Sequence, residues 1–181
     1  MFEYFGLILV ALSWMGGYLL ISKFYDKSLP TISKHAASHR TASWLFAAIL
    51  ILLGAAFYWW LIKWFTPQLE LSAVFTFILT ITILSQFIAA VAPDVDGWRG
   101  VVHRWSAWLM AVLYLPLGVL IILSPQLTLA IQIICSLLLM YMFIGFVLVA
   151  VMGKAKSKYL PLQASYIVSF QLIILASAYL S

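Results

Sequence analysis

Charged residues are scarce in this chain of 181 residues: they make up 8% of it, whereas hydrophobic residues make up 66%. Water-soluble domains carry about 25% charged residues, and so apolar a chain cannot hide its surface in a core of its own. The composition therefore excludes a soluble globular protein and requires a bilayer as the solvent. We expect one integral membrane domain over residues 1–181.

Two further features are missing, namely paired cysteines and a signal peptide. Cys135 is the one cysteine of the sequence, which excludes a disulfide framework. It lies within an apolar run, and we expect it to fill space between helices. No basic stretch precedes the first apolar run and no cleavage pattern follows it, so we expect no cleavable signal peptide.

Six apolar runs are long enough to span a hydrocarbon core about 30 Å thick, which takes about 20 helical residues. Inside a bilayer they must be helices, because a lone strand leaves its backbone groups unsatisfied. Short connections around Pro67 and Pro125 make neighbouring helices antiparallel. The sequence predicts an all-α, polytopic membrane protein, a compact bundle of six transmembrane helices. The runs lie near 4–22, 43–65, 71–92, 104–124, 127–152 and 159–180.

The basic residues gather on one side of this expected membrane. The net charge of +5 does not indicate a nucleic-acid partner, because these residues flank apolar runs, where they set orientation. Lys63 alone falls on the opposite side. By the positive-inside rule both termini lie outside and the 92–108 loop is cytoplasmic. The nine residues on the expected cytoplasmic side are Lys23, Lys27, Lys34, Arg40, Arg99, Arg104, Lys154, Lys156 and Lys158.

Amide and aromatic side chains inside the apolar runs add detail. A buried amide must find a partner in hydrocarbon, so we expect interhelical links from four glutamines. They are Gln86, Gln132, Gln163 and Gln171. We expect an aromatic belt at the outer interface, formed by Tyr58, Trp59, Trp60 and Trp64. Small residues in the first two runs allow close helix packing, which leaves a homo-oligomer open.

Residues 92–108 form the densest polar stretch of the chain, between two apolar runs. They include two of the five acidic residues and two of the three arginines. We expect a polar site here, either ligand-binding or structural, completed by the first loop. Its candidate residues are Ser33, His39, Arg40, Asp94, Asp96, Arg99, His103 and Arg104.

A structural interpretation explains the same stretch. Pro93 would end the third helix, since the residue before a proline avoids the α region. Asp96 starts an Asp-Gly turn, and one aspartate could cap the next helix. Charged groups near hydrocarbon are costly unless paired. We therefore expect His103 or Arg104 to meet Asp94 or Asp96.

The histidines permit a metal-binding alternative. If the first loop winds as a helix, His35 and His39 share a face at i and i+4. His103 and Asp94 could then complete a zinc-like ligand set with a water as nucleophile. We favour separate roles instead: His35 is solvated or makes a hydrogen bond of its own, and His39 and His103 each make one structural hydrogen bond. Haem ligation is disfavoured, because the histidines lie near one interface.

Short motifs recur in a recognisable order. Ile32-Ser33 lies in the first loop, Ala92-Pro93-Asp94 follows the third run, and His103 opens the fourth. This order resembles the six-helix bacterial and archaeal family known as domain of unknown function 998, which is similar in layout to the Frag/DRAM/Sfk group. The chain departs from the family pattern at Ala92 and at Gln163, which no arginine follows. The resemblance implies a fold and a polar site, and no established reaction.

Two functions fit these observations. The first is recognition of a membrane lipid or small amphiphile at the cytoplasmic face, without a cofactor, in the plasma membrane of a prokaryote. Basic loops near anionic lipid contribute about 1 kcal/mol per charge. The second is a zinc-dependent membrane-embedded hydrolase, which requires His35, His39, His103 and Asp94 to converge on one ion.

Overall fold

The computed structural model describes residues 2–26, 29, 31–152 and 159–180. These residues form helices and contain no strand. Six helices are long and apolar enough to cross a membrane, which confirms the predicted all-α six-helix bundle. The helical elements, with η for π-helical segments, are α1 (Phe5–Lys23), α2 (Ile32–Ser38), α3 (Arg40–Ala48), η1 (Ile49–Leu53), α4 (Gly54–Trp60), η2 (Leu61–Phe65), α5 (Thr66–Gln68), α6 (Ala73–Val91), α7 (Trp98–Ile122), α8 (Leu129–Met152) and α9 (Tyr159–Tyr179).

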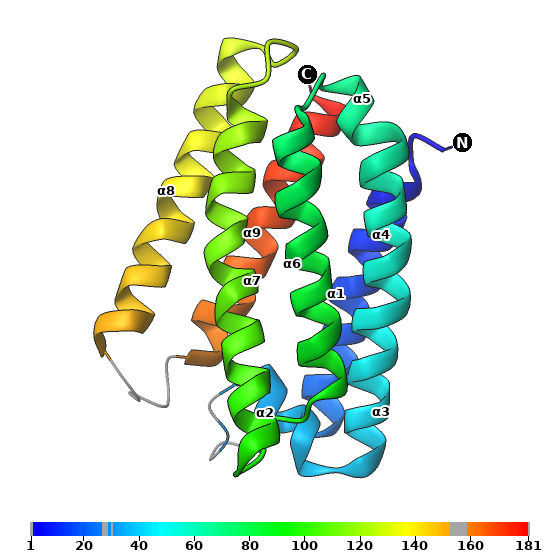
Figure 1. Cartoon of the computed structure of the whole chain (residues 1–181), viewed down its shortest axis with the longest axis vertical. Coiled ribbons are helices and arrows are strands. Elements are labelled where there is room, and N and C mark those ends of the chain that lie inside the picture. The colour runs from blue at the N-terminus through cyan, green and yellow to red at the C-terminus, as the bar shows by residue number, and fades with distance from the viewer. Residues whose placement is uncertain (1, 27–28, 30, 153–158, 181) are drawn as a thin grey trace.

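The long helices pack as an up-and-down bundle (Figure 1). The strongest pairings join α6 with α7 and α8 with α9, while α1 packs against α4 and α9. The two termini lie at one end of the bundle, whereas α2 and the loop between α6 and α7 lie at the other (Figure 1). The two polar stretches singled out in the sequence are therefore brought to the same end.

An added short helix and an earlier start of the fourth membrane helix differ from the sequence prediction. The first loop contains α2, which is too short and polar to register as an apolar run; the Thr31 side chain caps it by accepting from the Lys34 backbone N–H at 3.1 Å. The fourth membrane helix begins at Trp98 and not near 104. Gly97, with φ of 91°, precedes it in a conformation that favours glycine. His103 and Arg104 therefore stand in the second turn of α7.

The second membrane helix is one continuous helical stretch over Arg40–Gln68, longer than the predicted 43–65. It contains the two π-helical segments η1 and η2, a form defined by hydrogen bonds from residue i to residue i+5. Gln86 of α6 donates from Nε2 to the Leu50 carbonyl oxygen in η1 at 2.8 Å. The π segment is thereby tied to the neighbouring helix.

Two other glutamines also join helices. Gln163 of α9 accepts from the Ile32 N–H at the start of α2 at 3.0 Å. Gln171 of α9 donates to the Ser13 hydroxyl on α1 at 3.3 Å. The predicted interhelical role is thus confirmed for three of the four amides, while Gln132 makes no such link within the part of the chain that the structure describes.

The expected aromatic belt is wrong at Trp60. This side chain is 0% exposed and belongs to the core, whereas Trp59 is about half exposed. The Trp60 ring lies against Gly6 of α1, where an added Cβ would come within 2.4 Å of ring carbons. Its indole N–H donates to the Phe2 carbonyl oxygen at 3.2 Å. A ring that can pack on a glycine and satisfy its N–H is stable inside the bundle.

The predicted burial of Cys135 is confirmed.

We predict that Gly6→Ala destabilises the bundle, because the fully buried Trp60 ring has no free space to move into. Overpacking of this kind costs about 1–3 kcal/mol. The matched control is Gly17→Ala on the same helix, where an added Cβ meets nothing within 4 Å. The measurement is the free energy of unfolding in mixed micelles of increasing dodecyl sulfate content. Equal effects of the two substitutions would contradict the close packing of α1 on Trp60.

Candidate functional site

Asp94 is held in an inward position by the chain around it. Helix α6 ends at Val91 and Ala92 is extended, as expected for a residue that precedes Pro93. The loop then turns tightly, with the Val95 N–H donating to the Pro93 carbonyl oxygen at 2.9 Å. A Cβ on Gly100 would overlap the Val95 carbonyl oxygen, so this glycine lets the loop lie against α7. The Asp94 residue is left 7% exposed.

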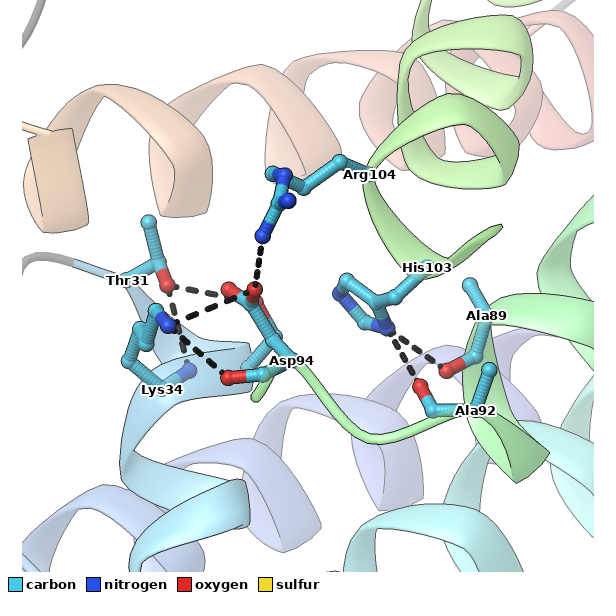
Figure 2. A network of polar contacts seen from close by, with 8 residues as sticks. Thr31, Lys34, Ala89, Ala92, Asp94, His103 and Arg104 are labelled. Carbon is cyan, nitrogen blue, oxygen red and sulfur yellow. Dashed lines mark hydrogen bonds and ion pairs between the residues drawn. The ribbon is translucent and has the colours of Figure 1, made fainter. Parts of the chain in front are cut away.

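Two cations and a hydroxyl surround the Asp94 carboxylate (Figure 2). Lys34 Nζ of α2 and a terminal nitrogen of Arg104 on α7 each lie 3.5 Å from Oδ1. Ser33 Oγ donates to Oδ2 at 3.4 Å, and Lys34 Nζ also donates to the Asp94 carbonyl oxygen at 2.9 Å. We call Ser33, Lys34, Asp94 and Arg104 the Asp94 cluster. It confirms the expected pairing of Arg104 with an aspartate.

The cluster carries an excess of positive charge. Lys34 and Arg104 contribute two positive charges, and Asp94 contributes one negative charge. Lys34 is part-buried, but the Arg104 side chain is 49% exposed. A buried carboxylate is stable only when paired, so the contacts to Asp94 account for one of the two cations. The second positive charge is free to meet an anion from outside.

His103 closes the same end of the bundle. Its Nδ1 lies 2.9 Å from the Ala89 carbonyl oxygen and 2.8 Å from that of Ala92. Carbonyl oxygens only accept, so Nδ1 carries a proton and donates to both. The ring thereby satisfies orphan carbonyls at the C-terminal end of α6. Its other nitrogen points to the side on which Asp94 and Arg104 lie (Figure 2). The expected structural hydrogen bond of His103 is confirmed.

The structural hydrogen bond expected of His39 is wrong, whereas His35 makes a hydrogen bond of its own. His35 is 0% exposed; its Nδ1 donates to the Thr31 carbonyl oxygen at 2.7 Å, and its ring stacks on Tyr25 at 5.8 Å. His39 is exposed and lies beside the Phe24 ring at 5.5 Å, with no side-chain hydrogen bond to another described residue. The physical reason is a break in the helix. Because α2 ends at Ser38 and His39 is extended, the two rings do not share a helical face.

The ligand set of the metal-binding alternative is not assembled. His35, His39, His103 and Asp94 lie in four different surroundings, and the described residues contain no group of three His, Cys, Asp or Glu side chains placed to hold an ion. A zinc site needs its ligands about 2.0–2.2 Å from one point. The geometry therefore gives the hydrolase alternative no support.

The other candidate residues stay outside the cluster. Arg40, Asp96 and Arg99 are exposed. Asp96 does not cap α7, which has no side-chain cap at Gly97, and the Arg99 guanidinium lies over the Trp98 ring at 5.7 Å. Sequence reasoning missed Lys34. The available signal was Thr31, a capping residue that indicates a helix start three residues before Lys34.

An open groove adjoins Arg104 on α7. It has a volume of about 490 Å³, and its described lining is Val101, Arg104, Trp105 and Trp108. The Trp105 side chain is 74% exposed. We call this surface the Arg104 groove. It places an exposed guanidinium at the edge of an apolar, aromatic surface.

Comparison of the chain with protein-family models, curated proteins and solved structures gives no match. The resemblance to the six-helix family therefore stays a prediction. The motif residues nevertheless touch one another: Ser33 donates to Asp94, His103 donates to Ala92, and Gln163 accepts from Ile32. Four motifs that are distant in the sequence form one connected polar region.

We predict that Asp94→Asn destabilises the protein by about 1–2 kcal/mol, the scale of a partly solvated charge-assisted contact. The substitution removes the negative charge between Lys34 and Arg104. Asp96→Asn is the matched control, because Asp96 is exposed in the same loop, and surface changes of this kind stay within about 0.5 kcal/mol. Unfolding free energies in mixed micelles measure both. Loss of stability in Asp96→Asn equal to that in Asp94→Asn would refute the organising role of Asp94.

Proposed function

We propose that this protein binds an anionic membrane lipid, with the headgroup on Arg104 and the tail in the Arg104 groove. The observation that carries the proposal is the position of Arg104, which links a buried carboxylate to an open apolar surface. No catalytic step is part of the proposal.

The chemistry of the guanidinium supports an anionic headgroup. Arginine has five N–H donors in a planar fork and binds phosphate or carboxylate through two parallel hydrogen bonds. In this protein Arg104 makes a single contact to Asp94, at 3.5 Å, which leaves most of its donors for a ligand. Lys34 keeps Asp94 paired while Arg104 bonds elsewhere, because Lys34 Nζ contacts both its carboxylate and its carbonyl oxygen.

The lining of the groove supports an acyl tail. Trp105, Trp108 and Val101 are exposed large hydrophobic residues beside Arg104. Tryptophan is enriched where hydrocarbon meets the headgroups, because its ring is apolar and its N–H is polar. The headgroup and the tail of an amphiphile would therefore contact Arg104 and the apolar residues within one helical turn of it on α7.

The proposal includes an orientation. The end of the bundle that holds α2 and the α6–α7 loop carries the basic residues of both, and we propose that it faces the cytoplasm, with both termini outside. Short basic loops remain on the cytoplasmic side during insertion. The cytoplasmic leaflet is also the one rich in anionic lipid, so the orientation and the ligand agree.

We predict that alkaline phosphatase fused after Ser181 is active in a bacterial host, since this reporter folds only outside the cytoplasm. A fusion truncated at Asp96 should be inactive. A green fluorescent protein in the same two positions should give the reciprocal pattern. Fluorescence from the fusion after Ser181 would reverse the orientation.

We also propose that the chain belongs to the family it resembles, in a prokaryotic plasma membrane. The support is the contact of its motif residues with one another, for example Ser33 with Asp94 at 3.4 Å. Residues that a family retains at separate motifs are expected to serve one site. An alignment in which the positions of Ser33 and Asp94 vary independently would count against this assignment.

The binding proposal predicts that Arg104→Gln removes the preference for anionic lipid. Loss of one cation near the surface weakens binding by about 1 kcal/mol, roughly fivefold. The measurement is native mass spectrometry of the purified protein with phosphatidylglycerol and phosphatidylcholine of matched chains. Arg99→Gln is the control, because Arg99 lies on the same helix outside the groove lining. An unchanged preference in Arg104→Gln, or equal retention of both lipids by the unaltered protein, would reject the proposal.

A further inference from the structure

A second groove lies farther along α7, against α8. It has a volume of about 330 Å³ and is lined by Leu115, Val119 and Ile122 of α7 and by Ser136, Leu139, Met140 and Phe143 of α8. The one polar side chain in this lining is Ser136, and its hydroxyl already donates to the Gln132 carbonyl oxygen at 2.7 Å. Nothing in the lining requires a polar partner, so the α7–α8 groove suits a hydrocarbon chain.

The two grooves lie along one face of α7. The apolar residues of α7 that line them recur at spacings of three, four and seven residues, which places side chains on the same face of a helix. Val112 falls between the grooves on this face and is exposed. Trp108 of the first groove packs edge-on against Phe146 of α8 at 5.3 Å, one turn from Phe143 of the second. In chain order the lining residues are Val101, Trp105, Trp108, Leu115, Val119 and Ile122.

The length of this face exceeds one leaflet. Arg104 and Val119 are separated by fifteen residues, which is about 22 Å at a helical rise of about 1.5 Å per residue. A hydrocarbon core is about 30 Å thick, so a leaflet supplies about half of that. The distance from Arg104 to Val119 in the α7–α8 groove is therefore greater than the thickness of one leaflet. A lipid tail that starts at Arg104 must be longer than that thickness to reach Val119.

Charge distinguishes the two ends of the face. The sequence contains no charged residue and no histidine from Trp105 to Gly153. A separate anionic lipid from the other leaflet would find no cation on α8 or on the part of α7 that lines the α7–α8 groove, whereas Arg104 stands at the first groove. The single cation favours one occupant, attached at Arg104 and extending through both grooves.

We infer that the ligand is a long single-chain anionic lipid, with its phosphate on Arg104 and its chain along α7 into the α7–α8 groove. This inference rests on the proposed function and adds the class of lipid. Because the surrounding bilayer is as apolar as the groove, the chain gains close packing and no hydrophobic transfer energy. The specificity for length is therefore set by contact with the groove walls.

The test compares decyl phosphate, whose chain ends short of the second groove, with docosyl phosphate, whose chain reaches it. Retention of each by the full-length protein is measured by native mass spectrometry from neutral detergent. Val119→Trp fills the α7–α8 groove from α7, and Ser136→Phe fills it from α8 as an independent variant. Leu137→Trp is the control, because Leu137 is exposed on α8 outside the groove lining.

Both groove-filling variants should bind docosyl phosphate about fivefold more weakly, near 1 kcal/mol, and should bind decyl phosphate as the unaltered protein does. Leu137→Trp should change neither. If Arg104→Gln weakens both probes but the groove-filling variants spare docosyl phosphate, the second groove is not part of the site and the proposed function stands. If Arg104→Gln spares both probes, the proposed function fails with the inference. If the unaltered protein shows the mass of a dimer and the groove-filling variants do not, the groove is a subunit interface and the inference is wrong.

Discussion

A carboxylate at the edge of hydrocarbon must be paired, and the cytoplasmic end proposed for this bundle is organised by that requirement. Asp94 brings together the loop after α6, helix α2 through Lys34, and helix α7 through Arg104. None of these segments could hold the arrangement alone, because α2 has seven residues and isolated helices of that length are unstable in water. The ion pairs and the cap at Thr31 supply the stability that so short a helix lacks on its own.

Hydrogen bonds between helices complement this cluster in the rest of the bundle. Lipid tails are as apolar as leucine, so contacts between apolar helices gain only packing energy in a bilayer. Gln86, Gln163 and Gln171 each reach from one helix to another. The bond from Gln86 to Leu50 also ties the π-helical segment η1 to α6. The amides therefore help to fix which helices are neighbours.

Most of the fold follows from the sequence, whereas only part of the site does. Six apolar runs and the pairing of Arg104 with an aspartate were predictable from hydropathy and from the cost of unpaired charge. Helix α2 was not, because a seven-residue polar helix leaves no apolar run. The different surroundings of His35 and His39 were hidden because they depend on a break at His39 that the i and i+4 spacing does not reveal. Lys34 was missed because contact with Asp94 needs tertiary placement of α2.

The two ring nitrogens of His103 have different roles. Nδ1 donates to the carbonyl oxygens of Ala89 and Ala92, and it does so in the neutral and in the charged imidazole alike. The attachment of α7 to the end of α6 is therefore independent of the protonation state of the ring. The other nitrogen lies on the side that faces Asp94 and Arg104 (Figure 2). One side chain thus joins two helices and also turns a ring nitrogen toward the groups that the proposed lipid headgroup would meet.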